Sequence, residues 1–318
     1  MSVRLPSEFA VILNLGKLMI LQQGQLDEVA QANYFDENSP CHIYFVCRRP
    51  RITVDKDAFK VSKEFVDFKF LVQRQDKFEN VDVKLGNPSG SEDIFIKSDY
   101  PFTVFQLWSQ DEFIMGANSA LFLQSFASYL KSPTYLDLEI LYIGQSYGVD
   151  GARTAPDRLK SHSTLQGIYA EAMAKNPDSE VWLALASFEQ VNLMMFDGRT
   201  KFSEKEKEED SKRMPIVYDK LNNEGLNEQQ KINFTEAALI RYFAPPYNKI
   251  YKDSFPNPAH STYSECYDLD INSICIEMQT AEMGLCDFYS QSIPPGPWHM
   301  KDFQLKSREE RKSMFDFV

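Results

Sequence analysis

The sequence has no apolar run long enough to cross a membrane. Its most apolar early stretch, from Phe9 to Leu21, is interrupted by Lys17 and falls short of the roughly 20 apolar residues of a membrane helix. No small-residue cleavage site follows this stretch, as it would in a secretory signal. The sequence therefore predicts neither membrane insertion nor export, and we expect a cytoplasmic protein.

An excess of positive charge is also missing. The 34 Lys and Arg residues are outnumbered by 46 Asp and Glu residues, which gives a formal net charge of −12 at pH 7. This balance argues against a broad basic surface that binds nucleic acid through counterion release, so any contact with nucleic acid has to be local. The acidic surface could instead face a basic protein partner, or simply keep the protein soluble.

Cysteines with metal-binding spacing are absent as well. The five cysteines are odd in number, and their spacings differ from those of zinc knuckles. No glycine-rich phosphate loop and no nucleophile elbow is present. We expect reduced thiols, as in most cytosolic proteins, at Cys41, Cys47, Cys266, Cys275 and Cys286.

What the chain does contain is typical of a folded protein with a sizeable core. Its 318 residues, 43% hydrophobic and 13% aromatic, fit two domains or one compact unit with a large insertion. Mixed strand and helix patterns predict an α+β fold. We expect a β-rich N-terminal domain over residues 1–130, a central domain over 131–255 with a charged insertion at about 199–215, and a β-rich C-terminal extension over 256–318.

The first part of the chain reads mainly as strand. A change to helical spacing behind Asn118 predicts a helix to Lys131, which Ser132-Pro133 ends. An alternating strand then follows over 135–142. Short aromatic and β-branched runs predict the earlier strands over 42–47, 66–72, 93–97, 102–107 and 112–115.

The second part alternates between helix and strand. Asn227 is placed to cap a helix over 228–243, and the highly charged segment behind Ser203 matches a capping box with Glu206. We expect that charged segment to be an exposed helix or loop. The other predicted elements are a helix from Pro156 to about Lys175, a strand covered on both faces over 181–188, and strands over 273–278 and 285–289.

One group of residues suggests phosphodiester chemistry. The sequence Tyr142-Ile-Gly-Gln-Ser146 closes the strand over 135–142, and Arg158 and His162 follow on the next predicted helix. Four positions apart, Arg158 and His162 project from one helix face and can reach one ligand. A phenol, a guanidinium and an imidazole together can handle a water, a phosphate and a proton. The alternative is a solvated polar face.

Glu236 falls inside an apolar stripe. On the helix predicted over 228–243 the stripe is formed by Ile232, Ile240 and Phe243, and Glu236 lies at the same spacing. A buried, unpaired carboxylate is strongly disfavoured. We therefore expect Glu236 to be paired with a cation or a metal ion, or to lie where the stripe meets a cleft. A closed salt bridge with Arg or Lys is the purely structural alternative.

These residues carry a resemblance to a known family. In order and local context, the chain over about 135–250 resembles the GIY-YIG nucleases, through Tyr142-Ile-Gly144, Arg158-x-x-x-His162 and the stretch from Glu236 to Tyr247-Asn248. The resemblance implies a small α/β core with an antiparallel sheet in the central domain. It also implies a metal-dependent endonuclease that hydrolyses DNA, in a restriction, mobile-element or phage-defence context.

The resemblance also implies roles for five residues. Tyr142 would orient the water or the scissile phosphate, and Arg158 would stabilise charge in the transition state. His162 would hydrogen-bond a phosphate or assist proton movement. Glu236 would be the sole protein ligand of Mg²⁺ or Mn²⁺, with waters and phosphate oxygens completing the coordination. Asn248 would support the site.

One expected element is missing. Family members usually carry a Gly-Ile-Tyr tyrosine about ten residues before Tyr142, on a paired strand, and its phenol is the favoured general base. Tyr135 is too near in sequence, and Tyr129 lies in the helix predicted behind Asn118. The alternative for the paired strand is 102–107, with Tyr100 close by. The base stays unassigned, and the alternative function is an inactive GIY-YIG-like module that binds nucleic acid or a protein partner.

Overall fold

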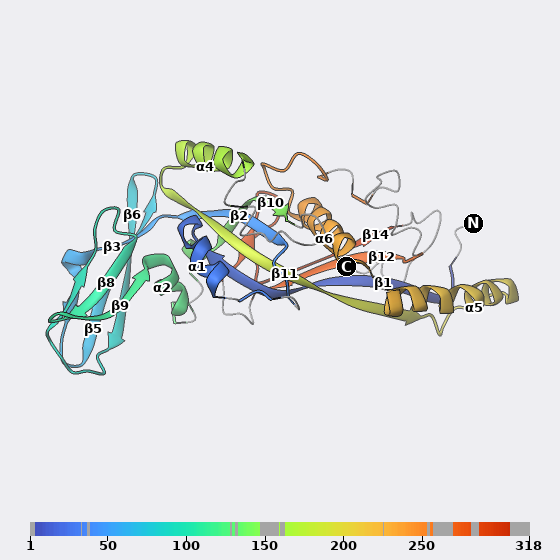
Figure 1. The fold of residues 1–318 in the computed structure, drawn as a ribbon, viewed down its shortest axis with the longest axis horizontal. Helices are drawn as coiled ribbons and strands as arrows, with labels where there is room; N and C mark the ends of the chain where they lie inside the picture. The colour runs from blue at the N-terminus through green and yellow to red at the C-terminus, as the bar shows by residue number, and fades with distance from the viewer. Residues whose placement is uncertain are drawn as a thin grey trace.

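The protein is an elongated α+β fold in which strands predominate (Figure 1). None of the helices in the described part of the chain is both long and apolar enough to cross a membrane. A computed structural model describes residues 4–32, 34–36, 39–127, 129–130, 133–146, 159, 163–224, 226–252, 255–256, 270–280 and 286–305.

A seven-stranded sheet forms the centre of the molecule. Neighbouring strands are antiparallel, except that β10 and β13 are parallel, as are β1 and β12. The sheet takes strands from all three segments predicted as domains, so the expected boundaries near 130 and 255 do not separate sheets. Its order is β13 (Phe288–Tyr289), β10 (Leu138–Gln145), β2 (Ile43–Pro50), β11 (Ser179–Phe196), β1 (Ser7–Leu21), β12 (Ser273–Gln279), β14 (Trp298–Gln304).

The middle of this sheet is buried on both faces. On β11 the side chains from Trp182 to Ala186 are all fully buried, which confirms the prediction of a strand covered on both sides. Helix α6 (Glu228–Phe243) shares a core with one face of β2 and β10, and α4 (Ser163–Lys175) shares a second core with the other face. We call these the α6 face and the α4 face.

The chain between β2 and β10 forms a β-rich unit of its own, at the end of the molecule away from α5 (Figure 1). Two small antiparallel sheets and helix α2 enclose a core of Phe68, Phe70, Phe105 and Phe122. Asn118 caps α2 as predicted, although α2 is shorter than expected. The elements are β3 (Ile52–Val54), β4 (Lys60–Val61), β5 (Phe65–Arg74), β6 (Lys77–Gly86), β7 (Ile94–Lys97), β8 (Val104–Ser109), β9 (Glu112–Asn118) and α2 (Ser119–Ser125).

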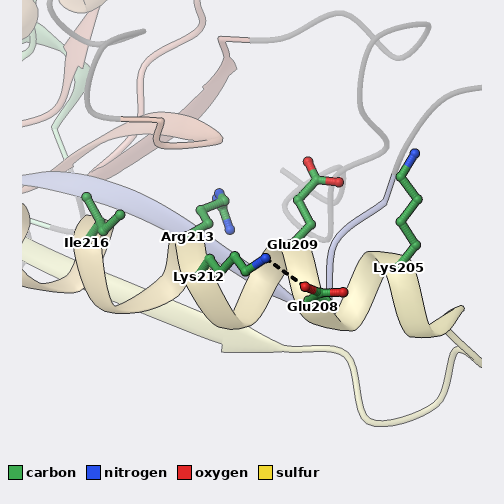
Figure 2. Close-up of a pocket in the computed structure, with 6 residues that line it drawn as sticks. All are labelled: Lys205, Glu208, Glu209, Lys212, Arg213 and Ile216. Atoms are coloured by element: carbon green, nitrogen blue, oxygen red, sulfur yellow. Dashed lines mark hydrogen bonds and ion pairs between the residues drawn. The ribbon is translucent and has the colours of Figure 1, made fainter.

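The charged segment is helix α5 (Glu204–Asp219), which begins with the predicted capping box of Ser203 and Glu206. Its exposed side is solvated as expected, and Lys212 pairs there with Glu208 at 2.7 Å (Figure 2). Its inner side differs from the prediction, because Asp210 is buried and Arg213 is partly buried. Asp210 accepts a hydrogen bond of 2.7 Å from Ser7 Oγ at the start of β1, and Arg213 pairs with Asp210 and with Asp270.

The remaining elements are short. The four cysteines in the described residues, Cys41, Cys47, Cys275 and Cys286, are buried free thiols, as predicted, and Cys266 lies outside those residues. The strand expected over 135–142 begins three residues later, because 134–136 form a 3-10 turn. The other elements are η1 (Gln23–Gln25), α1 (Leu26–Gln31), η2 (Lys56–Ala58), η3 (Thr134–Leu136) and a π-helical turn, η5 (Lys220–Glu224).

Candidate functional site

Tyr142 has a tyrosine beside it on the adjacent strand. Strands β10 and β2 are antiparallel, with Gly144 opposite Tyr44 and Tyr142 opposite Val46. Tyr142 and Tyr44 therefore lie diagonally on the α4 face, with ring centroids 6.2 Å apart and an interplanar angle of 36°. Tyr44 belongs to the triplet His42-Ile43-Tyr44, which differs from Gly-Ile-Tyr only at its first position.

The partner strand suggested from the sequence was wrong. The segment over 102–107 contributes to β8, which pairs with β7 and β9 in a separate sheet, and the nearby Tyr100 is 86% exposed. Tyr135 lies in the turn η3 before β10. The physical reason is that residues 51–137 are inserted between the two paired strands, so the partner of Tyr142 is not its neighbour in sequence. The available signal was the triplet ending in Tyr44, on a strand that was itself predicted.

Gly144 has to be glycine because Tyr44 occupies the space above it. A Cβ atom at Gly144 would lie 2.4 Å from the hydroxyl oxygen of Tyr44 and 2.5 Å from its Cζ. Both distances are far below a normal van der Waals contact, and Tyr44 is fully buried. The glycine therefore allows the phenol of Tyr44 to lie directly against the backbone of β10.

The ends of β2 and β10 are tied together by His42 and Ser146. The backbone N–H of Ser146 donates to the carbonyl of His42 at 2.8 Å. In return, His42 Nδ1 lies 2.6 Å from the carbonyl oxygen of Ser146. Since a carbonyl can only accept, Nδ1 carries the proton, and this buried imidazole fixes the register of the two tyrosines.

Asn248 holds β10 from its other edge. Its side-chain oxygen accepts from the N–H of Ile143 at 2.9 Å, and its side-chain nitrogen donates to the carbonyl of Ile143 at 2.8 Å. The N–H of Tyr247 also donates to the carbonyl of Leu141 at 3.1 Å. Residues 247–248 thus replace a neighbouring strand along the part of β10 that extends beyond β13.

Glu236 is buried in the stripe of α6, as its spacing predicts. It is 8% exposed, and Ile232, Ile240 and Phe243 around it are also buried. The amide nitrogen of Gln145 donates to Glu236 Oε2 at 2.7 Å and to Asn233 Oδ1 at 2.9 Å. A role for Gln145 was not foreseen, because its spacing along β10 does not show which helix it faces.

The tyrosine pair and Glu236 approach β10 from opposite faces. Tyr44 and Tyr142 contact the core beneath α4, whereas Ile143 and Gln145 face α6, as alternation along a strand requires. The structure thus brings Tyr142 together with Tyr44, Asn248 with Ile143, and Glu236 with Gln145. A single ligand that touches both Tyr142 and Glu236 would have to lie around the end of β10.

The two remaining predicted residues, Arg158 and His162, lie outside the described residues. Leu159, between them, is described and is buried in the core beneath α4. From Ser163 onward α4 follows the predicted helix to Lys175. The chain therefore contacts the α4 face, where the tyrosine pair lies, at Leu159 between these two residues and again at Leu165 after them.

Two further tyrosines on the α4 face, Tyr169 and Tyr247, have raised pKa values. Burial raises the pKa of Tyr169 on α4 to about 12. Burial, together with the nearby carboxylate of Glu171, raises the pKa of Tyr247. Both phenols are therefore protonated at neutral pH and can act only as hydrogen-bond donors or acceptors.

A hard divalent cation such as Mg²⁺ needs oxygen ligands. Within the described ranges, no group of three or more His, Cys, Asp or Glu side chains is arranged to hold a metal ion. Mg²⁺ often takes only one or two carboxylates from a protein and keeps several waters. The carboxylate of Glu236, oriented by Gln145, fits such a single-ligand site. Comparison of the chain with models of known families, with curated proteins and with solved structures found no match.

Proposed function

We propose that the protein is a metal-dependent endonuclease with a GIY-YIG-like core, acting on DNA through a local site. The observation that carries this proposal is the pair Tyr44 and Tyr142 on adjacent antiparallel strands. A paired-strand tyrosine was the one element of the family pattern that the sequence lacked. Such an activity fits a restriction, mobile-element or phage-defence role for a cytoplasmic protein.

In this proposal each residue has a chemical task. Tyr44 is the general base that accepts the proton of the attacking water, and Tyr142 orients the water or the scissile phosphate. Arg158 and His162 bind the phosphate and its developing charge. His42 and Asn248 are positioning residues, because they bond the backbone of Ser146 and Ile143, at and beside the end of β10.

Glu236 would hold the cation, with Gln145 keeping its carboxylate in place. A bound Mg²⁺ or Mn²⁺ would polarise the phosphate and lower the charge that builds up on it. Substituting Glu236 by Gln removes the negative charge and leaves the size of the side chain nearly unchanged. Cleavage is therefore expected to require both the divalent ion and the carboxylate.

The test uses the full-length protein, supercoiled plasmid DNA and either Mg²⁺ or Mn²⁺. Tyr44→Phe removes one hydroxyl, and we expect it to slow cleavage by about a hundredfold or more, as does loss of a general base. Tyr100→Phe is the matched control, because Tyr100 is highly exposed and lies in the loop between β7 and β8, outside the seven-stranded sheet. Thermal unfolding of each variant separates loss of chemistry from loss of fold. A Tyr44→Phe variant that cleaves as fast as the wild type would exclude Tyr44 as the base.

A second candidate is an inactive GIY-YIG-like module that binds nucleic acid or a basic protein partner. Two observations favour it: Tyr44 is fully buried, and Glu236 approaches β10 from the face opposite the tyrosines. In this case the wild type is inert with both metal ions. It still binds DNA or a basic partner, and Glu236→Gln leaves that binding unchanged.

A further inference from the structure

A cavity of about 450 Å³ lies within the β-rich unit, between its two small sheets. Phe68 on β5, Leu85 on β6, Leu107 on β8 and Met115 on β9 line it, and Phe122 on α2 also contributes to its wall. Pockets of about 300–1,000 Å³ with mainly apolar walls are typical of small-molecule sites. None of these residues belongs to the tyrosine pair or contacts Glu236.

The apolar wall is rigid. The ring of Phe122 packs against Phe68, Phe70 and Phe105, with centroids 5.1 to 5.7 Å apart. Phe68 and Leu107 are almost completely buried, although both border the cavity. The surrounding side chains are thus held in place by one another, and a ligand would enter a preformed space.

The loop over 86–91 at the rim of the cavity is held by hydrogen bonds within the unit. Asn87 donates from its side-chain nitrogen to the carbonyls of Ser62 and Ser91, each at 2.8 Å. Its side-chain oxygen accepts from Ser89 Oγ at 2.7 Å. Gly90 has a φ of +63°, which closes this loop without strain. The amide of Asn87 is therefore committed to holding the loop.

Glu112 is the only ionisable side chain among the residues that line the cavity. It is exposed at the start of β9, and no ion pair is recorded for it within the described part of the chain. Residues 92–118 contain five acidic residues and one basic residue, Lys97. Lys97 lies over the ring of Trp108, on the opposite face of the small sheet from Leu107. Among its lining residues the cavity therefore carries one negative charge and no positive one.

We propose that this cavity binds a small organic cation whose body is aromatic or aliphatic and whose ammonium group lies beside Glu112. The apolar body fills the space between the sheets, where water makes few hydrogen bonds. The ammonium stays at the mouth, where it remains partly hydrated and lies next to the carboxylate of Glu112. Water and the carboxylate together compensate the cost of removing its charge from bulk solvent. An anion with the same body is disfavoured by the acidic surroundings.

The test compares three probes that share one body: 3-phenylpropyltrimethylammonium, 3-phenylpropanol and 3-phenylpropanesulfonate. Titration calorimetry on the full-length protein is expected to show the order cation, alcohol, sulfonate from tightest to weakest. Glu112→Gln should weaken the cation about five- to tenfold, as loss of one partly exposed charge contact does, and leave the alcohol unchanged. Glu92→Gln, a neighbouring acid that does not line the cavity, is the matched control.

A second variant tests the location. Ser109→Phe should fill the space and abolish binding of both the cation and the alcohol. Equal binding of the cation and the sulfonate overturns the proposal, and so does cation binding that Glu112→Gln leaves unchanged. If no probe binds, the cavity is an internal void or the seat of a partner's apolar side chain, and the proposal also falls. Nuclease activity enters none of these measurements.

Discussion

The hydroxyl of Tyr44 stands where a side chain at position 144 would begin, 2.4 Å from an ideal Cβ on Gly144. The phenol of Tyr44 on β2 can therefore occupy this position only because residue 144 on β10 has no side chain. A glycine in a strand normally destabilises the strand. At Gly144 this cost has to be offset by the packing that the missing side chain makes possible. That packing is the contact of the buried Tyr44 ring with the backbone of β10.

We predict that Gly144→Ala destabilises the protein by about 1–3 kcal/mol, because the new methyl group overpacks the site. The cost should fall in a Tyr44→Leu background, since the closer of the two rings that the methyl meets is then absent and only Tyr142 Cε1, 2.8 Å from the ideal Cβ, remains. Chemical denaturation of the four proteins in this double-mutant cycle measures the coupling. Additive effects would show that the close approach is relieved elsewhere.

Asn248→Ala is expected to cost about 2–4 kcal/mol, since it leaves both the N–H and the carbonyl of the buried residue Ile143 without a partner. Asn248→Asp loses the donor only when its carboxylate is ionised, because the protonated acid has both a donor and an acceptor, so its cost should be smaller at acidic pH than at neutral pH. The exposed Asn80→Ala is the control. Hydrogen exchange at the amide of Ile143 should accelerate only in the Asn248 variants.

Two neighbouring cations on α5 should differ in their contribution to stability (Figure 2). Arg213 is partly buried beside Asp210, which is buried, and Asp270, which is half-exposed, whereas Lys212 is exposed and pairs with Glu208. Arg213→Ala should therefore cost about 2–3 kcal/mol, because it removes the cation beside the buried carboxylate of Asp210. Lys212→Ala should change the free energy of unfolding by less than about 1 kcal/mol. Equal effects would mean that the inner side of α5 is open to solvent.

Asp137, directly before β10, gives a prediction of pH dependence. Burial, and then the nearby Asp287, raise the pKa of Asp137 to about 6, above its usual value of 3.8. The folded state thus binds more protons than the unfolded state between these values. Stability from this group is present below pH 4 and is lost as pH rises through about 6.

Asp137→Asn should remove that dependence. Because Asp137 is only partly buried, we expect a gain of about 1 kcal/mol at pH 8 and almost none at pH 4. The exposed Asp76→Asn is the control, and thermal unfolding at both pH values is the measurement. A gain at pH 4 as large as that at pH 8 would contradict the assigned cause.

Local signals predicted the elements well. Asn227 and the apolar stripe located α6 correctly, Asn118 identified the start of α2, and Ser203 with Glu206 identified the start of α5. These signals work because caps and helical spacing depend on residues within a few positions of one another. Burial of Glu236 followed from the same reasoning.

Contacts between residues far apart in the chain could not be predicted from these local patterns. The pairing of Tyr44 with Tyr142, the contact of Gln145 with Glu236 and the bonds from Asn248 to Ile143 each join distant segments. An antiparallel pair separated by a whole β-rich unit leaves no spacing signal in the sequence. The buried side of α5 was missed for a related reason, because its partners Ser7 and Asp270 lie far away in the chain.

The insertion between β2 and β10 also has a consequence for folding, and we expect the inserted unit to form before the two strands pair. Tyr44 and Tyr142 are 142 minus 44, or 98, positions apart, so pairing them in an unfolded chain closes a long loop. Once the inserted unit has folded, its two ends lie close together. Pairing β2 with β10 then loses little further chain entropy. Variants that slow folding of the inserted unit should therefore delay formation of the tyrosine pair, even though they touch neither residue.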